Sequence, residues 1–383
     1  MLDEIDKEII NNKEKAKDFL FSFCKKRTEI ERANWLKNIL IRNKFEIKEL
    51  NSFDKNRNKR PNLIITIPGK SKKRLWFIAH LDSVDPFFEP YIADNKVYGR
   101  GAIDNGQSLI AILIMFLILK KLAIKPYRTI CAAFVSDEEK GSNFGLKYLI
   151  KKQIFNKTDL FLVPDAGDSD GSLIDVIEKS VIWLKFILEN KQEHAALAIK
   201  NIISLASEFV EKLSMVLYRK FSFQDFLFNP CISTFNFTEF ISKSESINTV
   251  PSKVELYLDC RILPYYDART VLTTIKKFVT YFAKTNKIKI TYTILQFNKA
   301  KKTAISKIFT TALEKAIFDV YKVNAKEKGS SGSTFATFLR NHKFQALVWE
   351  KVDPVWHSQN EFCNLNNLIN DCRVFVRLAC AKL

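Results

Sequence analysis

The sequence predicts an α/β protein: a largely parallel sheet with helices on both faces, interrupted by a smaller insert. Three observations lead to this fold class. In the first part of the chain, short apolar runs alternate with helical stretches, which is typical of a largely parallel sheet. After Ser180 the order of elements changes, and after Phe297 the α/β character returns. Strands are expected at 62–69, 74–80, 128–139 and 159–168, with helices at 105–124 and 145–155.

The middle of the chain has the order βαββαβ, which is the ferredoxin-like unit. Strand-like runs at 180–190, 231–241, 252–263 and 287–295 surround amphipathic helices at 194–214 and 267–285. This order predicts a self-contained insert at 180–296. Residues 1–179 and 297–383 would then form one discontinuous domain, with a further strand at 344–350.

Length and composition indicate a globular protein of more than one domain. A chain of 383 residues is too long for one compact core. The first twenty residues are charged throughout, so we expect no secretory signal. The apolar run Leu109–Leu119 is too short for a membrane span and is expected to be a buried helix. Seven scattered cysteines without a C-x-x-C pair favour a reducing, cytoplasmic location.

The net charge of +19 raises the question of a nucleic-acid or membrane partner. The lysines are spread along the chain, and the one dense basic cluster, 55–74, flanks a short apolar segment. No recognition-helix pattern, RNP-type motif or zinc-finger spacing accompanies it. We therefore expect neither partner. A positive field would still attract a small anionic substrate.

Polar clusters follow the predicted strands at the points where those strands end. His80 and Asp82 come directly after the apolar run 75–79. Each cluster by itself has a plain explanation as a helix cap, a solvated loop or a turn. Together they should converge on one edge of the sheet, where functional residues of such folds gather. The remaining members of the set are Asp104, Glu138, Glu139, Asp165 and His357.

Two imidazoles and three carboxylates suit Zn²⁺ and related cations, Co²⁺ and Mn²⁺ included. Five side chains serve two ions if Asp104 bridges them, with room for a bridging water. Asp82 would accept the second N–H of His80 and so fix its tautomer. Glu138 is adjacent to a ligand but would point elsewhere, as general base toward that water.

This constellation resembles the zinc peptidases and deacylases, a family that includes succinyl-diaminopimelate desuccinylase, acetylornithine deacetylase, aminoacylase and bacterial dipeptidases. The similar blocks are "AHLDSV", "GRGAIDNGQS", "VSDEEKGS", "VPDAG" and "DPVWHSQNEF", in family order. The resemblance implies a catalytic domain interrupted by a lid domain used for homodimerisation. It implies one ion on His80, Asp104 and Asp165, a second on Asp104, Glu139 and His357, and Glu138 as the base.

Other blocks match more loosely. "KQEHAA" resembles the lid block whose histidine, here His194, reaches a neighbouring subunit's site. "INTVPSKVELYLDCR" points by resemblance to Asn248 and Arg261 as groups near the substrate. "GSSGSTFATFL" resembles a substrate loop and points to Gly332, Ser333 and Thr334. Two blocks depart from the common form: "NGQS" replaces Lys-Gly-Gly after Asp104, and alanine and leucine follow His194.

The expected function is a cytoplasmic di-zinc amidohydrolase that cleaves an amide bond next to a free carboxylate. An N-acyl amino acid such as N-succinyl-diaminopimelate is the first candidate substrate. A short peptide, cleaved by a dipeptidase or aminopeptidase activity, is the second. A non-catalytic binding protein on the same fold is the third hypothesis, but such a protein would be expected to lose Glu138 or a ligand.

Overall fold

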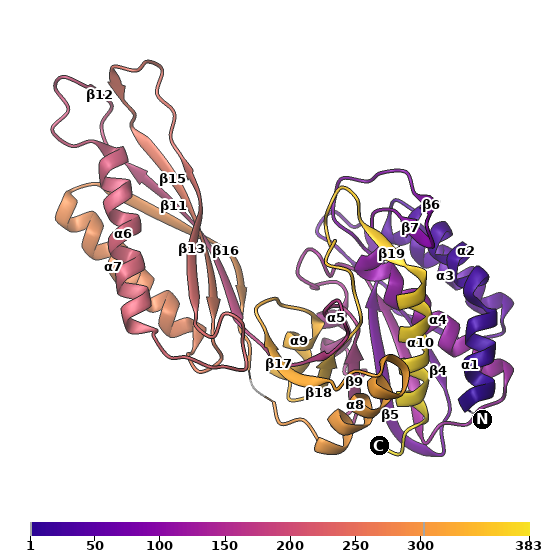
Figure 1. The fold of residues 1–383 in the computed structure, drawn as a ribbon. Coiled ribbons are helices and arrows are strands. Elements are labelled where there is room, and N and C mark those ends of the chain that lie inside the picture. Colours follow the sequence, from indigo (N-terminus) through magenta and orange to yellow (C-terminus); the bar gives the residue numbers. More distant parts are fainter. Residues whose placement is uncertain (1, 302) are drawn as a thin grey trace. The chain divides into compact units, whose positions relative to one another are not determined.

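The computed structural model describes residues 2–301 and 303–383, which form two compact units (Figure 1). The first unit comprises residues 2–176, 303–328 and 334–383. The second comprises 177–301 and 329–333, and the predicted insert, 180–296, falls within it.

The first unit is built around an eight-stranded sheet with the order β1-β4-β8-β5-β9-β18-β10-β17. The α/β fold class is confirmed, but the sheet is mixed: β8, β5, β9 and β18 are parallel, whereas the β1–β4, β4–β8 and β10–β18 pairings are antiparallel. One reason is that the loop 164–172 between β9 and β10 is too short for a crossover helix. The strands are β1 (Ile47–Glu49), β4 (Leu63–Ile67), β5 (Ser71–His80), β8 (Arg128–Val135), β9 (Leu160–Val163), β10 (Leu173–Glu178), β17 (Lys326–Ser330) and β18 (Gln345–Val348).

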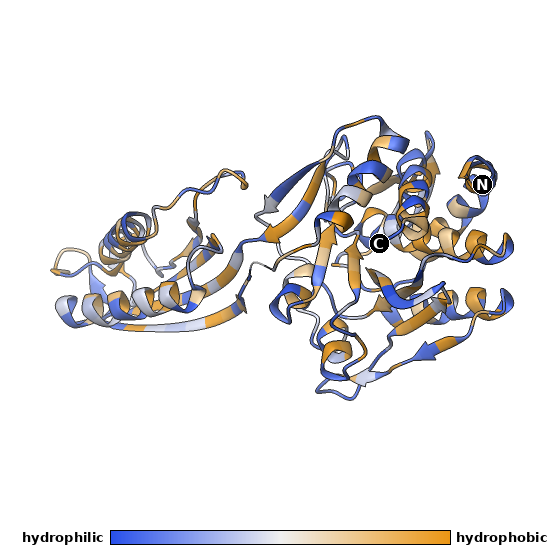
Figure 2. Cartoon of the chain, turned by 90° about the horizontal axis from the view of Figure 1, so that it is seen from below, coloured by the Kyte–Doolittle hydropathy of each residue, from blue (hydrophilic) through white to orange (hydrophobic). Residues whose placement is uncertain are grey.

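Helix α4 (Ser108–Lys121) packs in the core of this unit, as the apolar run predicted. With the preceding segment η1 (Ala102–Gln107) it makes a 20-residue stretch that is long and apolar enough to cross a membrane by length and composition, but 94% of its most apolar window is buried. Figure 2 shows hydrophobic residues on the inner strands and helices. The other helices are α1 (Leu2–Asn11), α2 (Lys13–Cys24), α3 (Glu29–Arg42), α5 (Leu146–Lys151), α8 (Lys307–Tyr321), α9 (Phe335–Asn341) and α10 (Leu365–Cys380).

Short strands complete the first unit. They form one two-stranded and one three-stranded sheet: β2 (Ser52–Phe53) with β3 (Lys59–Arg60), and β19 (Phe362–Asn364) with β7 (Lys96–Tyr98) and β6 (Tyr91–Ala93).

The second unit is an antiparallel sheet, β13-β15-β11-β16, with helices α6 and α7 packed on it. Its elements follow the predicted βαββαβ order, and the spatial strand order 2-3-1-4 is that of the ferredoxin-like fold. The elements are β11 (Ser180–Glu189), α6 (Ile202–Lys220), β13 (Thr234–Ile241), β15 (Lys253–Ile262), α7 (Ala268–Asn286) and β16 (Lys289–Asn298).

One predicted boundary in this unit is wrong. The helix expected from His194 begins at Ile202, because the side chain of Asn201 accepts the N–H of Ile203 and caps the helix there. His194 lies instead in the two-residue strand β12 (Glu193–His194), which pairs with β14 (Thr249–Val250).

Phe116, fully buried in α4, tests the importance of this core helix. Phe116→Ala removes a large side chain from a packed interior, so we expect the free energy of unfolding to fall by about 3–5 kcal/mol. Urea denaturation in the presence of chelator measures this. Phe53→Ala is the matched control because the Phe53 side chain is 60% exposed, and it should change the midpoint little. Equal effects of the two substitutions would contradict the assignment of α4 to the core.

Candidate metal centre

The five predicted donors lie together at one edge of the first unit's sheet. His80 is the last residue of β5, whereas Glu139 and Asp165 follow the ends of β8 and β9. Asp104 lies in η1, before α4, and His357 lies in the loop after β18. The convergence follows from the parallel arrangement of β8, β5, β9 and β18, because the carboxyl ends of parallel strands meet at the same edge.

The donor atoms form two groups that share Asp104. In the first group, His80 Nε2 lies 2.8 Å from Asp104 Oδ1 and 3.3 Å from Asp165 Oδ1. In the second, His357 Nε2 lies 2.9 Å from Asp104 Oδ2 and 3.4 Å from Glu139 Oε1. Within each group the donor atoms lie within 4.8 Å of one another. The two oxygens of Asp104 thus face different histidines, as a carboxylate that bridges two ions would.

The backbone leaves the helical path at Asp104. Both Asp104 and Asn105 have non-helical backbone angles, and the peptide bond between them is cis. The buried Glu361 side chain accepts the N–H groups of Ile103, at 3.2 Å, and Asp104, at 3.3 Å. Glu361 itself is paired with Arg100 at 2.6 Å. This buried ion pair therefore holds the shared aspartate in place.

Asp82 contacts His80, but its carboxylate is not the nearest acceptor. His80 Nδ1 lies 3.0 Å from the main-chain oxygen of Asp82 and 3.5 Å from its carboxylate. The reason is that the Asp82 carboxylate accepts the N–H groups of Glu138 and Glu139, at 3.0 and 3.1 Å. Asp82 thus joins the end of β5 to the loop after β8, which the sequence did not indicate.

The variant block after Asp104 makes internal hydrogen bonds. The Asn105 side chain accepts the N–H of His80 and donates to Pro164 O, at 2.8 Å, and to Asp165 Oδ1, at 3.1 Å. Gln107 donates to the buried Asp371 carboxylate at 2.9 Å. These two residues therefore connect η1 to the ends of β5 and β9 and to α10.

Carboxylates crowd this edge of the sheet, and their pKa values diverge. Burial raises the pKa of Asp165 to about 6, against the opposing hydrogen bond from His80. Burial also opposes ionisation of Asp104, but hydrogen bonds from His357 and His80 hold its pKa well below the ordinary range. Hydrogen bonds to Asp104 and Glu139 raise the pKa of His357 to about 10. Without bound metal, the positive charges of His80 and His357 partly offset the negative charge of these carboxylates.

These residues fit a pair of divalent cations. Each group offers one imidazole and two carboxylates, which is the nitrogen and oxygen set that zinc and related metals accept. Glu139 Oε1 is buried, and the one partner near it among the described residues is His357 Nε2, at a long 3.4 Å. A buried carboxylate oxygen with so weak a partner is costly, and a cation between Glu139 and His357 would satisfy it.

Glu138 is next to this group without belonging to it. It is partly buried, and burial together with the Asp165 carboxylate raises its pKa well above the ordinary value. A carboxylate with a raised pKa is suited to carry a proton at neutral pH.

Most of the predicted substrate residues lie in the second unit. There, His194 contacts Asn248, and Arg261 contacts the loop that contains Gly332 and Ser333. His194 is exposed, and its Nε2 lies 3.2 Å from the side-chain amide of Asn248. Arg261 donates to the main-chain oxygen of Ser331, next to Gly332 and Ser333, at 3.1 Å.

Thr334 belongs to the first unit. It is the N-cap of α9, where its hydroxyl accepts the N–H of Ala336.

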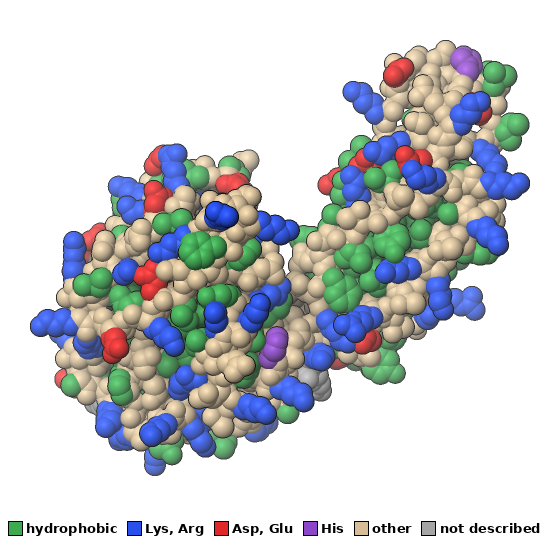
Figure 3. All heavy atoms as spheres, turned by 180° about the vertical axis from the view of Figure 1, so that it is seen from behind, with side chains coloured by type: hydrophobic (Ala, Val, Ile, Leu, Met, Phe, Trp, Pro, Cys, Tyr) green, Lys and Arg blue, Asp and Glu red, His purple; other side chains and the backbone are tan. Residues whose placement is uncertain are grey.

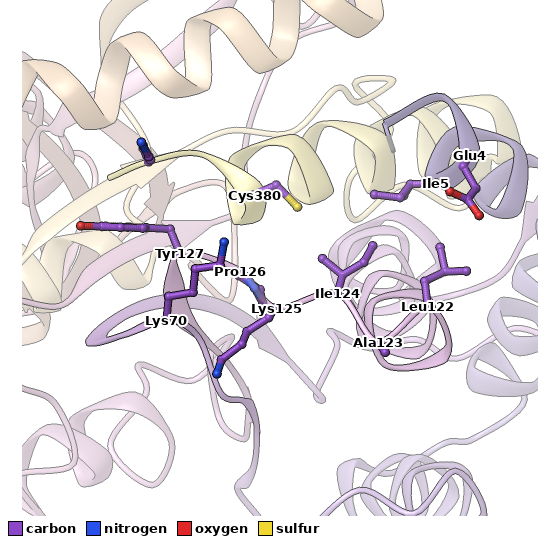
Figure 4. A pocket seen from close by; sticks show the side chains of 11 residues that line it. Glu4, Ile5, Lys70, Leu122, Ala123, Ile124, Lys125, Pro126, Tyr127 and Cys380 are labelled. Carbon is purple, nitrogen blue, oxygen red and sulfur yellow. The ribbon is translucent and has the colours of Figure 1, made fainter.

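A separate cavity of about 540 Å³ lies at the opposite edge of the same sheet (Figure 4). It is lined by Lys70 and Tyr127, which precede the first residues of β5 and β8. Because His80 is the last residue of β5 and Glu139 follows the end of β8, this cavity is not part of the candidate centre.

Comparison with known proteins identifies the family. The family model of Peptidase family M20/M25/M40 matches residues 76–381. The chain belongs to this family. It is 34% identical over 381 residues to an uncharacterised metallohydrolase of Methanocaldococcus jannaschii, which covers 91% of this chain and 93% of the relative. It is 26% identical over 294 residues, 76% of each chain, to a [LysW]-lysine/[LysW]-ornithine hydrolase of Sulfurisphaera tokodaii.

Solved structures show the same fold at low sequence identity. The di-peptidase Dug1p of Saccharomyces cerevisiae superimposes with a TM-score of 0.79 at 15% identity, over 99% of this chain and 98% of that one. A dinuclear metal-binding peptidase of Bacillus subtilis gives a TM-score of 0.67 at 14% identity, over 96% and 97%. This member of the M20/M25/M40 family is a metal-dependent hydrolase of amide or peptide bonds, which disfavours the hypothesis of a non-catalytic binding protein.

Removing the shared carboxylate should weaken both ion sites at once. Asp104→Asn keeps the size of the side chain but removes the charge that both donor groups use, so we expect bound metal to fall from up to two ions per chain toward none. Elemental analysis after dialysis measures this, and chelation of the wild type should abolish hydrolysis. Asp85→Asn, at an exposed position near His80, is the control. Full metal content in Asp104→Asn would refute the shared-ligand assignment.

Proposed function

We propose that the protein is a dimetal amidohydrolase in which Asp104 bridges the two ions. One ion takes His80, Asp104 and Asp165, and the other takes Asp104, Glu139 and His357. The observation that carries the proposal is that the two Asp104 oxygens face two different histidines, at 2.8 and 2.9 Å. Zinc is the proposed metal, and cobalt and manganese suit the same donors.

Besides the proposed metal ligands, Glu138 and Asp82 have roles in the proposed reaction. When bound, such a metal pair activates water and stabilises the developing oxyanion. Glu138 takes the proton from the attacking water and later delivers it to the leaving amine. Asp82 orients His80 and, through the two main-chain N–H groups that it accepts, fixes where Glu138 and Glu139 lie.

For the substrate we propose a small molecule with an amide bond next to a free carboxylate. The net charge of +19 favours an anion. Arg261, Asn248 and the loop of Gly332, Ser333 and Thr334 would bind its carboxylate. An N-acyl amino acid, cleaved as by succinyl-diaminopimelate desuccinylase, is the first candidate. A short peptide is the second, and it is favoured by the fold neighbours described as di- and tripeptidases.

His194 is proposed to donate to the transition-state oxyanion of a partner subunit in a homodimer formed through the second unit. Its exposure favours a role toward another chain. His194 Nδ1 accepts the N–H of Ala196 at 3.2 Å, which leaves Nε2, 3.2 Å from the side-chain nitrogen of Asn248, as the ring atom for the proposed donation.

The proposed base and the neighbouring ligand should separate in a mutational test. Glu138→Gln should keep the metal but lose several orders of magnitude in kcat, because it removes the proton carrier and no ligand. Glu139→Gln should lose metal from one site. The wild type, loaded with zinc, is assayed against N-succinyl-diaminopimelate, N-acetylornithine, other N-acyl amino acids and a dipeptide panel. Absence of turnover on all of them would refute the substrate proposal. Loss of metal in Glu138→Gln but not in Glu139→Gln would mean that Glu138 is the ligand and Glu139 the base.

The shared-site proposal predicts complementation between two inactive variants. His194→Ala should bind metal normally and lose about a hundred- to a thousandfold in turnover, because an oxyanion donor is missing. Mixed dimers of His194→Ala and Glu138→Gln chains should regain activity, since one of their two sites has both groups. Persistent inactivity in dimers verified to be mixed would mean that His194 acts within its own chain or has no part in catalysis.

A further inference from the structure

Arg32, on helix α3, has a buried guanidinium and is 1% exposed. Its Nε donates to Lys26 O at 3.1 Å, Nη1 to Leu81 O at 3.0 Å, and Nη2 to Arg100 O at 3.1 Å. All three acceptors are main-chain carbonyls. One planar group thus fastens three separate segments of the chain.

Two of these carbonyls belong to segments that carry proposed ligands. Leu81 lies between His80 and Asp82, and Arg100 begins the turn that leads to Asp104. That turn wraps closely around the guanidinium.

At Gly101 the backbone has φ +83°, and a Cβ atom would lie 2.8 Å from Arg32 Nη2. Glycine is required there for both reasons.

One turn earlier on α3, Glu29 contacts the third ligand-bearing segment. Its buried carboxylate accepts the N–H of Asp137 at 3.3 Å and pairs with Arg60 at 2.8 Å. Asp137 has φ +65°, a left-handed conformation that needs such support. The next two N–H groups, of Glu138 and Glu139, go to Asp82. Helix α3 therefore contacts, from one face, the segments of His80, Asp104 and Glu138–Glu139.

Packing alone does not call for an arginine at this place. Burying a guanidinium is costly unless its N–H groups are bonded, and an apolar side chain would fill the same volume. The rigid planar fork of arginine sets the directions of its hydrogen bonds, and lysine cannot reproduce it. The geometry points to Arg32 as a positioning residue that sets the spacing between the His80 and Asp104 segments, with Glu29 doing the same for the Glu138–Glu139 loop. Helix α3 lies outside the residues that the family model matches.

For its catalytic consequence this inference rests on the proposed function, so the test has a readout that needs no substrate. Metal-free protein is titrated with Co²⁺, and the visible absorption of the bound ions is recorded. Arg32→Lys keeps the charge but not the fork, and we expect about 10- to 100-fold weaker Co²⁺ binding, the usual effect of losing support around a ligand. Arg42→Lys is the matched control, since Arg42 is exposed on the same helix. It should bind Co²⁺ as the wild type does.

With an active substrate, Arg32→Lys should lower kcat by a similar factor and leave KM within about twofold, because the substrate-binding residues are untouched. Circular dichroism of the metal-free variant checks the fold. If Arg32→Lys does not fold, Glu29→Gln replaces it as the test variant. We then expect weaker Co²⁺ binding at only one of the two sites.

Wild-type Co²⁺ affinity and spectrum in the folded variants would overturn the inference. Altered Co²⁺ binding in a protein that hydrolyses none of the substrates would uphold it and refute the proposed function instead.

Discussion

The two carboxylate oxygens of Asp104 face two different histidines, and several contacts in the first unit hold Asp104 in that orientation. The chain departs from helical geometry at Asp104 and Asn105 and resumes it at α4. The N–H groups of Ile103 and Asp104 lie in the first turn of η1, where a helix offers them no partner, and Glu361 accepts both.

Charge is the second constraint that shapes this edge of the sheet. Asp104, Glu138 and Asp165 lie where burial disfavours ionisation, and the positive charges of His80 and His357 oppose that effect. Divalent cations would take over that balancing role and displace protons as they bind. The side chain of Arg100, close to the site, forms a structural ion pair with Glu361. Elsewhere, lysine and arginine side chains are scattered over the face shown in Figure 3.

The second unit uses an independent core, and its polar residues are organised by strand pairing. His194 meets Asn248 because β12 pairs with β14, and Arg261 reaches the loop 329–333 from β15. These pairings join residues that the family resemblance had indicated separately. Their roles toward a substrate stay predictions, as does homodimerisation.

Sequence by itself determined the α/β class, the βαββαβ order and the set of candidate donors. It could do so because these depend on local periodicity and on the rule that parallel strand ends meet at one edge. Only the tertiary structure decided which groups hold the donors. Glu361 is one charged residue in a loop, and Arg32 bonds to carbonyl oxygens, which every residue possesses. The antiparallel outer strands were also beyond local patterns, because strand neighbours are set in the folded sheet, whereas the start of α6 is set by a local cap, Asn201, that helical periodicity alone does not locate. Contacts between distant segments through main-chain atoms leave no trace in residue type, and the candidate metal ligands are supported largely by such contacts.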